Sequence, residues 1–172
     1  MPLKIFLIGL PGSGKSTLGK QLSDVLHRPF IDLDTEIERE CRMPIAEIFK
    51  SEGETWFREK EAHVLRKVSD ASDEFVMATG GGTPCFYSGI DFMNSKGLSI
   101  FLDVSIDVIT ERINSKEKSK RPLLTQEDID ISSVIRKLLN DRLPYYLKAL
   151  HRVSADDIDA NTLAKLIKRE RT

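Results

Sequence analysis

A glycine-rich stretch that follows an apolar run limits the possible folds of this chain more than any other feature. Residues 9–17 read GLPGSGKST, and they lie between the apolar run LKIFLI and the helical pattern LGKQLSDVL. Glycine allows backbone conformations and close approaches that a Cβ would block, so successive N–H groups can point at one anion. A strand, a turn of this composition and a helix that starts at the turn together predict a phosphate-binding loop.

The polar residues of this loop have separate predicted roles. Residues 9–16 match the pattern GxxxxGK[ST] at every defined position. We expect Lys15 to bring its charge to the β- and γ-phosphates of a nucleoside triphosphate, and the hydroxyl of Ser16 to bind Mg²⁺. The alternative is a glycine-rich turn that binds nothing. The residues predicted to contact the nucleotide here are Gly12, Ser13, Gly14, Lys15, Ser16 and Thr17.

Short apolar runs alternate with helical patterns along the rest of the chain. The runs lie at residues 3–9, 29–33, 74–79, 98–104 and 152–155, and the helical patterns at 15–27, 54–69, 106–113, 129–147 and 162–168. Runs without polar alternation are typical of strands buried on both faces of a parallel sheet. We therefore predict one α/β domain over residues 1–172, with helices on both faces of the sheet and ligands at the carboxyl ends of its strands.

Composition excludes several classes of partner. With 26 basic and 27 acidic side chains, the net charge of −1 produces no general attraction for nucleic acid or an anionic membrane. We expect Cys41 and Cys85 to be reduced thiols, because two cysteines without a secretory signal rarely form a disulfide. The N-terminal apolar run is too short for a membrane span, so we expect a cytoplasmic protein.

Two aspartates end the second predicted strand. In an extended chain Asp32 and Asp34 share one side, so Asp32 is expected to hold the water shell of Mg²⁺ and Asp34 to face an acceptor hydroxyl. The alternative is that Asp34 caps the helix that follows. Further along, Arg58 and Glu61 are three residues apart on a predicted helix and can pair, either as a surface salt bridge or as a fixed arginine fork for a carboxylate.

Three further segments carry unusual residues. Three glycines follow a strand at residues 80–82, which indicates either a flexible turn or a backbone that a ligand approaches closely. Arg142 lies two residues before Pro144, which should place it near a kink or a helix end. The polar segment 114–127 is expected to be a long loop, either disordered or a lid, in which Arg121 is either solvated or closes onto a phosphate.

The phosphate loop, DLD, GETWFREKE, ATGGG, RPLL and RLPYY, in this order, resemble the shikimate kinase family over about residues 3–150. The resemblance implies a small P-loop kinase of the nucleoside-monophosphate-kinase type, with parallel strand order 2-3-1-4-5. Such an enzyme transfers the γ-phosphate of ATP to the 3-hydroxyl of shikimate, in the chorismate pathway to aromatic amino acids. It also implies a cytoplasmic monomer that uses ATP and Mg²⁺.

The resemblance implies a role for each residue at the nucleotide end. Lys15 and the loop amides bind phosphates, and Ser16 binds Mg²⁺ with Asp32 behind it through a water. Arg112 is the match for the arginine that stacks on adenine. Arg121 closes with the lid and meets the transferring phosphoryl group.

At the acceptor end, the resemblance implies a site within about residues 34–61 and beyond. Asp34 holds the acceptor hydroxyls and can act as the base. Arg58 and Arg142 grip the carboxylate of shikimate, and Glu61 orients Arg58. The ring hydroxyls are approached by the backbone of Gly80, Gly81 and Gly82. The next residues, Thr83-Pro84-Cys85, depart from the family pattern.

Two other functions remain open from the sequence. One is another small-molecule kinase on the same scaffold, acting on gluconate or a nucleoside monophosphate. The other is an ATP-binding module without turnover. The arginines and the glycine triplet favour shikimate over the first alternative, and a pure binder would have little need of Asp34 or Arg121.

Overall fold

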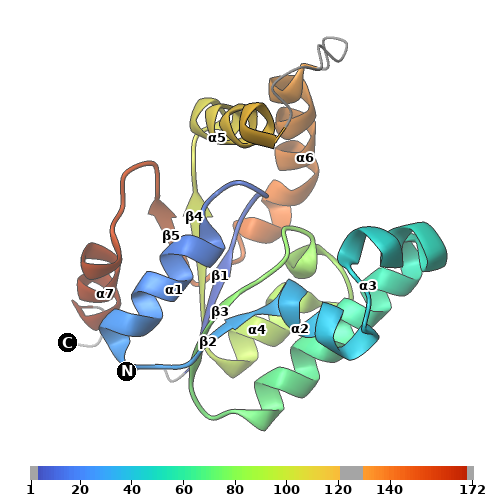
Figure 1. Cartoon of the computed structure of the whole chain (residues 1–172). Coiled ribbons are helices and arrows are strands. Elements are labelled where there is room, and N and C mark those ends of the chain that lie inside the picture. The colour runs from blue at the N-terminus through green and yellow to red at the C-terminus, as the bar shows by residue number, and fades with distance from the viewer. Residues whose placement is uncertain (1–3, 121–129, 170–172) are drawn as a thin grey trace.

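The computed structural model describes residues 4–120 and 130–169, in which five strands form one parallel sheet (Figure 1). The strand order is β2-β3-β1-β4-β5, and each neighbouring pair is parallel. The strands are β1 (Lys4–Ile8), β2 (Phe30–Asp32), β3 (Phe75–Ala78), β4 (Leu98–Asp103) and β5 (His151–Ser154). The predicted α/β class and the strand order implied by the resemblance are both confirmed.

Helices cover both faces of this sheet. They are α1 (Lys15–Leu26), α2 (Leu33–Cys41), α3 (Ile45–Ala71), the 3₁₀ helix η1 (Thr83–Cys85), α4 (Gly89–Lys96), α5 (Ile106–Lys120), α6 (Ile131–Tyr146) and α7 (Ala160–Arg169). Figure 1 shows α1 and α7 together on one face and α2, α3 and α4 on the other. Helices α5 and α6 pack together beyond the carboxyl ends of the strands, above the loop that joins β1 to α1.

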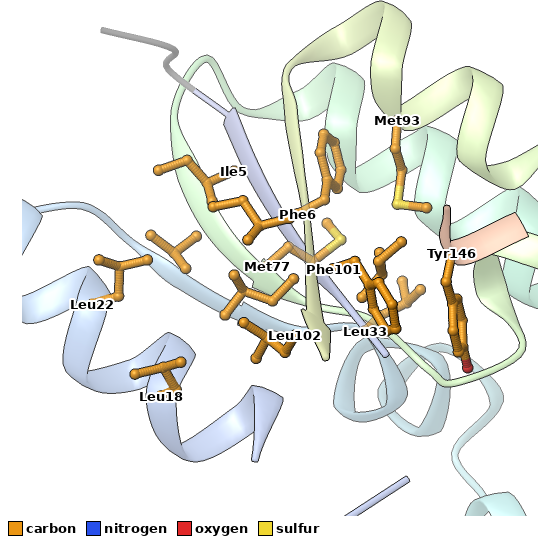
Figure 2. Packing of buried hydrophobic residues seen from close by; sticks show 14 of the residues in the cluster. Ile5, Phe6, Leu18, Leu22, Leu33, Met77, Met93, Phe101, Leu102 and Tyr146 are labelled. Carbon is orange, nitrogen blue, oxygen red and sulfur yellow. The ribbon is translucent and has the colours of Figure 1, made fainter. Parts of the chain in front are cut away.

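The core lies on both sides of the central strand, β1. Its residues from Ile5 to Ile8 are fully buried, which explains why this run shows no polar alternation. Figure 2 shows Leu22 of α1 on one side of the sheet, and Met93 of α4 and Tyr146 of α6 on the other. Each fully buried side chain of this kind contributes about 1.5–3 kcal/mol. The sheet is therefore a rigid base for the loops at its carboxyl end.

The long helix α3 begins earlier than the sequence predicts. It starts at Ile45 rather than at residue 54, and it is kinked at Gly53, whose φ of 83° lies outside the helical range. The left-handed conformation suits glycine. Because the kink interrupts the helical periodicity, the apolar pattern is regular only after it. Helix α4 and η1 are also absent from the prediction.

The expected loop at 114–127 is wrong in its first part. Helix α5 continues to Lys120, so residues 114–120 are helical. Lysine and glutamate are good helix formers, but a helical end without an apolar stripe has no periodicity to reveal it. Residues 121–129, which include Arg121, lie outside the described residues.

The two cysteines are separate free thiols, as predicted. Cys41 is the last residue of α2, and Cys85 is the last residue of η1, which follows the glycine triplet. Over residues 4–120 and 130–169, we find no helix with the length and apolar character of a membrane span.

A charged network joins α2 to α3. Glu40 accepts hydrogen bonds from the ammonium groups of Lys60 at 2.6 Å and Lys67 at 2.9 Å. The hydrogen bond from Lys60, and after it the one from Lys67, lowers the pKa of Glu40 to about 2. The network therefore fixes α2 to the second half of α3.

Replacing Glu40 with glutamine is expected to lower the free energy of unfolding by about 1 kcal/mol at neutral pH. The pKa of the glutamate in the folded chain lies below its ordinary value of 4.5. The stabilisation is therefore complete above about pH 4.5 and is lost as the pH falls towards 2. Urea unfolding of both proteins at several pH values checks this.

A suitable control for this experiment is Asp70→Asn, which removes a single exposed ion pair with Lys96. We expect this control to have a smaller effect at every pH. A difference between Glu40→Gln and the parent chain that stays constant from pH 7 to pH 3 would contradict the proposed linkage.

Candidate functional site

The loop between β1 and α1 has the geometry of an anion-binding nest. Three of its glycines have positive φ values: 146° at Gly9, 81° at Gly12 and 90° at Gly14. Gly14 is the residue before α1, and no side chain caps the first amides of that helix. The N–H of Ser13 donates to the carbonyl oxygen of Leu10 at 3.1 Å. The first amides of α1 have no side-chain cap and can bind a ligand, and the helix dipole favours a negative one.

One cavity of about 590 Å³ extends from this loop along the carboxyl ends of the strands. Its lining follows the strand order: Asp32 and Asp34 after β2, Thr79, Gly80 and Gly81 after β3, the loop after β1, Arg112 on α5 after β4, and residues 155–158 after β5. The cavity therefore lies at the carboxyl ends of the strands, where the sequence predicts the ligands to bind. A cavity of this size has room for two small ligands beside each other.

Lys15 lies buried in the loop, and its side chain folds back onto it. The ammonium group donates hydrogen bonds to the carbonyl oxygens of Gly9 at 2.9 Å and Leu10 at 2.8 Å. Desolvation is the largest cause that lowers its pKa to about 8, and the charge of Asp34 opposes it. The lysine is still mostly charged at pH 7, and an anion in the loop would strengthen that state.

The side-chain oxygens of Ser16 and Asp32 lie next to each other in the cavity. The Ser16 hydroxyl donates to Oδ2 of Asp32 at 2.6 Å. The other oxygen, Oδ1, accepts from the backbone N–H groups of Asp34 at 3.1 Å and Thr35 at 3.3 Å. Asp32 therefore caps α2, and the expectation of an extended chain through Asp34 is wrong. The alternative that Asp34 is the cap is also wrong.

Asp34 lies in the first turn of α2 and points into the cavity. Its side chain is exposed to the water of the cavity, but the protein walls replace much of the bulk water around it. This desolvation, followed by the charges of Asp32 and Glu61, raises the pKa of Asp34 to about 6. A carboxyl group with such a pKa is suited to accept a proton near neutral pH.

Arg58 and Glu61 form the predicted pair, and it is buried. The guanidinium NH1 of Arg58 donates to Oε2 of Glu61 at 2.9 Å, and the two side chains are 9% and 2% exposed. Because both groups are shielded, the alternative of a surface salt bridge is wrong. The guanidinium also lies 4.6 Å from the ring centre of Phe86 and 5.2 Å from that of Phe57. These contacts hold the plane of the guanidinium, while Glu61 aligns NH1 and Glu54 accepts from NH2 at 3.3 Å.

The glycine triplet brings Arg58 and Arg142 to the same short segment. A Cβ on Gly81 would lie 2.7 Å from NH1 of Arg142, and a Cβ on Gly82 would lie 2.5 Å from Cζ of Arg58. Any larger residue would push the guanidinium groups away. Among the three glycines, Gly80 and Gly81 line the cavity. Glu61 adjoins Gly80, Arg142 adjoins Gly81, and Arg58 adjoins Gly82, so these three side chains lie at the acceptor edge of the cavity.

Arg142 lies near the end of α6, as its position before Pro144 predicts. The hydroxyl of the fully buried Tyr146 donates to the carbonyl oxygen of Gly81 at 2.7 Å. No role for Tyr146 follows from the sequence, although the motif RLPYY contains it.

Arg112 crosses the other end of the cavity. Its two terminal nitrogens donate to the carbonyl oxygens of Gly12 at 3.3 Å and Asp156 at 3.4 Å. Oδ1 of Asp156 in turn accepts from the backbone N–H of Ser105 at 2.7 Å. Asp156 was missed because a lone acidic residue after a weak strand carries no pattern. Arg121 is beyond the described residues, so its place relative to Arg112 is not described.

Comparisons with known proteins agree with this geometry. Residues 11–170 match the family model described as shikimate kinase. A shikimate kinase of Bacteroides thetaiotaomicron is 40% identical over 158 residues, which are 91% of this chain and 89% of that protein. A crystal structure of shikimate kinase from the same species has a TM-score of 0.88, at 34% identity over the whole of both chains. Shikimate kinase from Acinetobacter baumannii in complex with shikimate has a TM-score of 0.83 and is 32% identical, over 99% of this chain and 93% of that one.

Proposed function

The chain belongs to the shikimate kinase family, and on this premise we propose that its cavity holds ATP and shikimate together for one phosphoryl transfer. The observation that carries the proposal is the continuous lining from the phosphate loop to Asp34, Gly80 and Gly81. In the reaction, the 3-hydroxyl oxygen of shikimate forms a bond to the γ-phosphorus as the bond to the β-phosphate oxygen breaks. ADP leaves with that oxygen, and the hydroxyl proton passes to a base.

The nucleotide end depends on backbone groups and two cations. The amides of the loop and of the first turn of α1 would surround the phosphates. Lys15 would exchange its bonds to the Gly9 and Leu10 carbonyls for bonds to phosphate oxygens. These bonds are stronger because both partners are charged. Arg112 lines the far part of the cavity, where it is proposed to contact the adenine.

The residues at the loop fit Mg²⁺. A serine hydroxyl and a carboxylate beside the phosphates are the hard oxygen donors that this ion takes together with substrate phosphates and water. Ser16 would bind it directly and Asp32 through a water, as their 2.6 Å separation in one cavity allows. The ion supplies charge neutralisation for the transferring group.

At the acceptor end, Asp34 and the two arginines divide the recognition of shikimate. Asp34 faces the cavity and is proposed to orient the hydroxyl and receive its proton. Arg58 and Arg142 meet at Gly81 and Gly82, so two cations are available for one carboxylate. The proposal also keeps Arg121 as the cation that meets the transferring phosphoryl group. A monomeric state and a cytoplasmic location stay predictions.

An ATP-coupled assay with shikimate, quinate, gluconate and nucleoside monophosphates tests the proposed reaction. We expect turnover with shikimate and ADP release in equal amount. Turnover on one of the other acceptors with none on shikimate would overturn the proposal. ATP binding without turnover on any acceptor would favour the non-catalytic module instead.

The pH dependence of kcat/KM for shikimate should show an acid limb near pH 6. The pKa of Asp34 is raised to about 6, and only its ionised form can take the hydroxyl proton. As the pH falls below 6, the ionised fraction drops, so kcat/KM should fall about tenfold per pH unit. Steady-state kinetics from pH 5 to 8 measure this limb.

The matched control for the pH profile is the residual activity of Asp34→Asn, which cannot titrate at this position. Its profile should lack the limb near pH 6. If the parent and variant profiles have the same acid limb, the limb belongs to another group, and the assigned role of Asp34 in proton transfer is wrong.

A further inference from the structure

Thr83, directly after the glycine triplet, is a buried residue whose hydroxyl holds Glu61. It is 3% exposed and begins η1. Its Oγ1 lies 2.7 Å from Oε1 of Glu61. An ionised carboxylate only accepts hydrogen bonds, so the threonine hydroxyl is the donor.

The backbone around Thr83 is fixed on both sides. Its N–H donates to the carbonyl oxygen of Gly80 at 3.2 Å, which closes a tight turn over the triplet. Its own carbonyl oxygen packs so closely on α4 that a Cβ on Gly89 would lie 2.0 Å from it. The backbone that carries the short Thr83 side chain is therefore fixed, and so is the position of its hydroxyl beside Glu61.

Glu61 divides its two oxygens between Thr83 and Arg58. Oε1 accepts from Thr83, and Oε2 accepts from Arg58 at 2.9 Å. With 2% of its side chain exposed, Glu61 has little water to replace a lost donor. The bond from Thr83 therefore sets the rotation of the carboxylate, and this rotation sets where its second oxygen holds the guanidinium.

This bond lies directly behind the cavity wall. A Cβ on Gly80 would be 2.7 Å from Oε1 of Glu61, 3.0 Å from Oγ1 of Thr83 and 3.4 Å from Oδ1 of Asp34. Gly80 and Asp34 line the cavity, whereas Thr83 and Glu61 do not. Gly80 therefore separates Thr83 from the cavity, so Thr83 lies close to the proposed acceptor site without lining it.

We propose that Thr83 is a positioning residue for the acceptor carboxylate, acting through Glu61 on Arg58. The inference rests on the proposed role of Arg58. Without the hydroxyl, the Glu61 carboxylate loses its second anchor and turns within its pocket. Arg58 keeps its contacts with Glu54 and the phenyl rings, but NH1 loses its alignment by Glu61. The fork then meets the substrate carboxylate less well. Among the described residues, Lys15, Ser16 and Arg112 make no hydrogen bond to this chain of bonds, so the nucleotide end should not respond.

The test is Thr83→Val, which keeps the volume and the β-branch and removes the donor. We expect KM for shikimate to rise about tenfold, with kcat and KM for ATP within about twofold of the parent values. Thr83→Ser restores the hydroxyl and should bring KM for shikimate back to within about twofold. A residue that only supports the fold would not separate the two KM values in this way.

A second buried hydroxyl provides the matched control. Ser99 is fully buried in β4 and bonds to Asn94 and to the N–H of Leu150, away from the cavity. Ser99→Ala should lower the melting temperature and leave both KM values unchanged. If Thr83→Val does not fold, Thr83→Ala is measured instead by calorimetric titration with shikimate, with the same expected weakening.

The possible results separate this inference from its premise. If Arg58→Ala raises KM for shikimate and Thr83→Val does not, the role of Thr83 is overturned and the proposed function stands. Equal increases in KM for shikimate and for ATP in Thr83→Val also overturn it. If Arg58→Ala itself leaves KM for shikimate unchanged, the proposed carboxylate site fails first.

Discussion

Replacing Asp34 with asparagine should lower kcat by about 10²–10⁴-fold, with KM for ATP changed by less than about twofold. Asparagine has nearly the same shape and still accepts a hydrogen bond, so the acceptor alcohol can bind. Asparagine cannot take a proton at neutral pH. The pKa of the Asp34 carboxyl group is raised to about 6, which makes this group well suited to that step. Steady-state kinetics with each substrate varied in turn measure the effect.

The structure separates this effect from damage to the helix. The backbone N–H of Asp34 donates to Oδ1 of Asp32, so the cap of α2 does not depend on the side chain at 34. Glu36→Gln, two residues further along the same helix, is the control, because Glu36 pairs with the exposed Arg39 outside the cavity. We expect near-parental kcat for it. An unaltered kcat in Asp34→Asn would show that the carboxylate only orients the alcohol.

The residues that sequence analysis placed correctly are those with a local and obligatory pattern. Three glycines with positive φ, a following lysine and a serine form the phosphate loop from contacts within a few residues. The pairing of Arg58 with Glu61 follows from helical spacing alone. Strands buried on both faces likewise carry their own signal, so the sheet was predictable from runs such as that of β1.

The features that were missed depend on contacts between distant segments or on a weak local choice. Thr83 meets Glu61 across 22 positions of sequence, and Tyr146 meets Gly81 across 65. No spacing rule reports either contact. At Asp32, the choice between continuing the strand and capping a helix depends on one side chain turning back to two N–H groups. Propensities of neighbouring residues do not decide that choice.

Arg58→Ala should raise KM for shikimate by roughly 10- to 150-fold, which corresponds to about 1.5–3 kcal/mol for a hydrogen bond between charged groups. In this chain the guanidinium is buried against three phenyl rings and aligned by Glu61. The side chain therefore loses little conformational entropy when it binds a carboxylate. KM for ATP should stay within about twofold, because the arginine lies behind the acceptor end of the cavity.

The matched control for this variant is Arg66→Ala on the same helix. Arg66 also lies over a phenyl ring, that of Phe92, and donates to the carbonyl oxygen of Tyr87, but it is not part of the cavity. It should leave both KM values unchanged. Removal of Arg58 also leaves Glu61 buried without its cation, so thermal unfolding of both variants is needed beside the kinetics.

Arg58→Lys separates the charge of the side chain from its geometry. Lysine retains the positive charge beside Glu61 but replaces the planar fork with a single ammonium group. If the substrate carboxylate needs the fork, KM for shikimate should lie between those of the parent and Arg58→Ala. If charge alone is sufficient, Arg58→Lys should match the parent, and the alignment of the guanidinium by Glu61 would then have no consequence for binding. A KM for shikimate that is unchanged in both variants would mean that Arg58 does not hold the carboxylate, and the proposed carboxylate site would then be wrong.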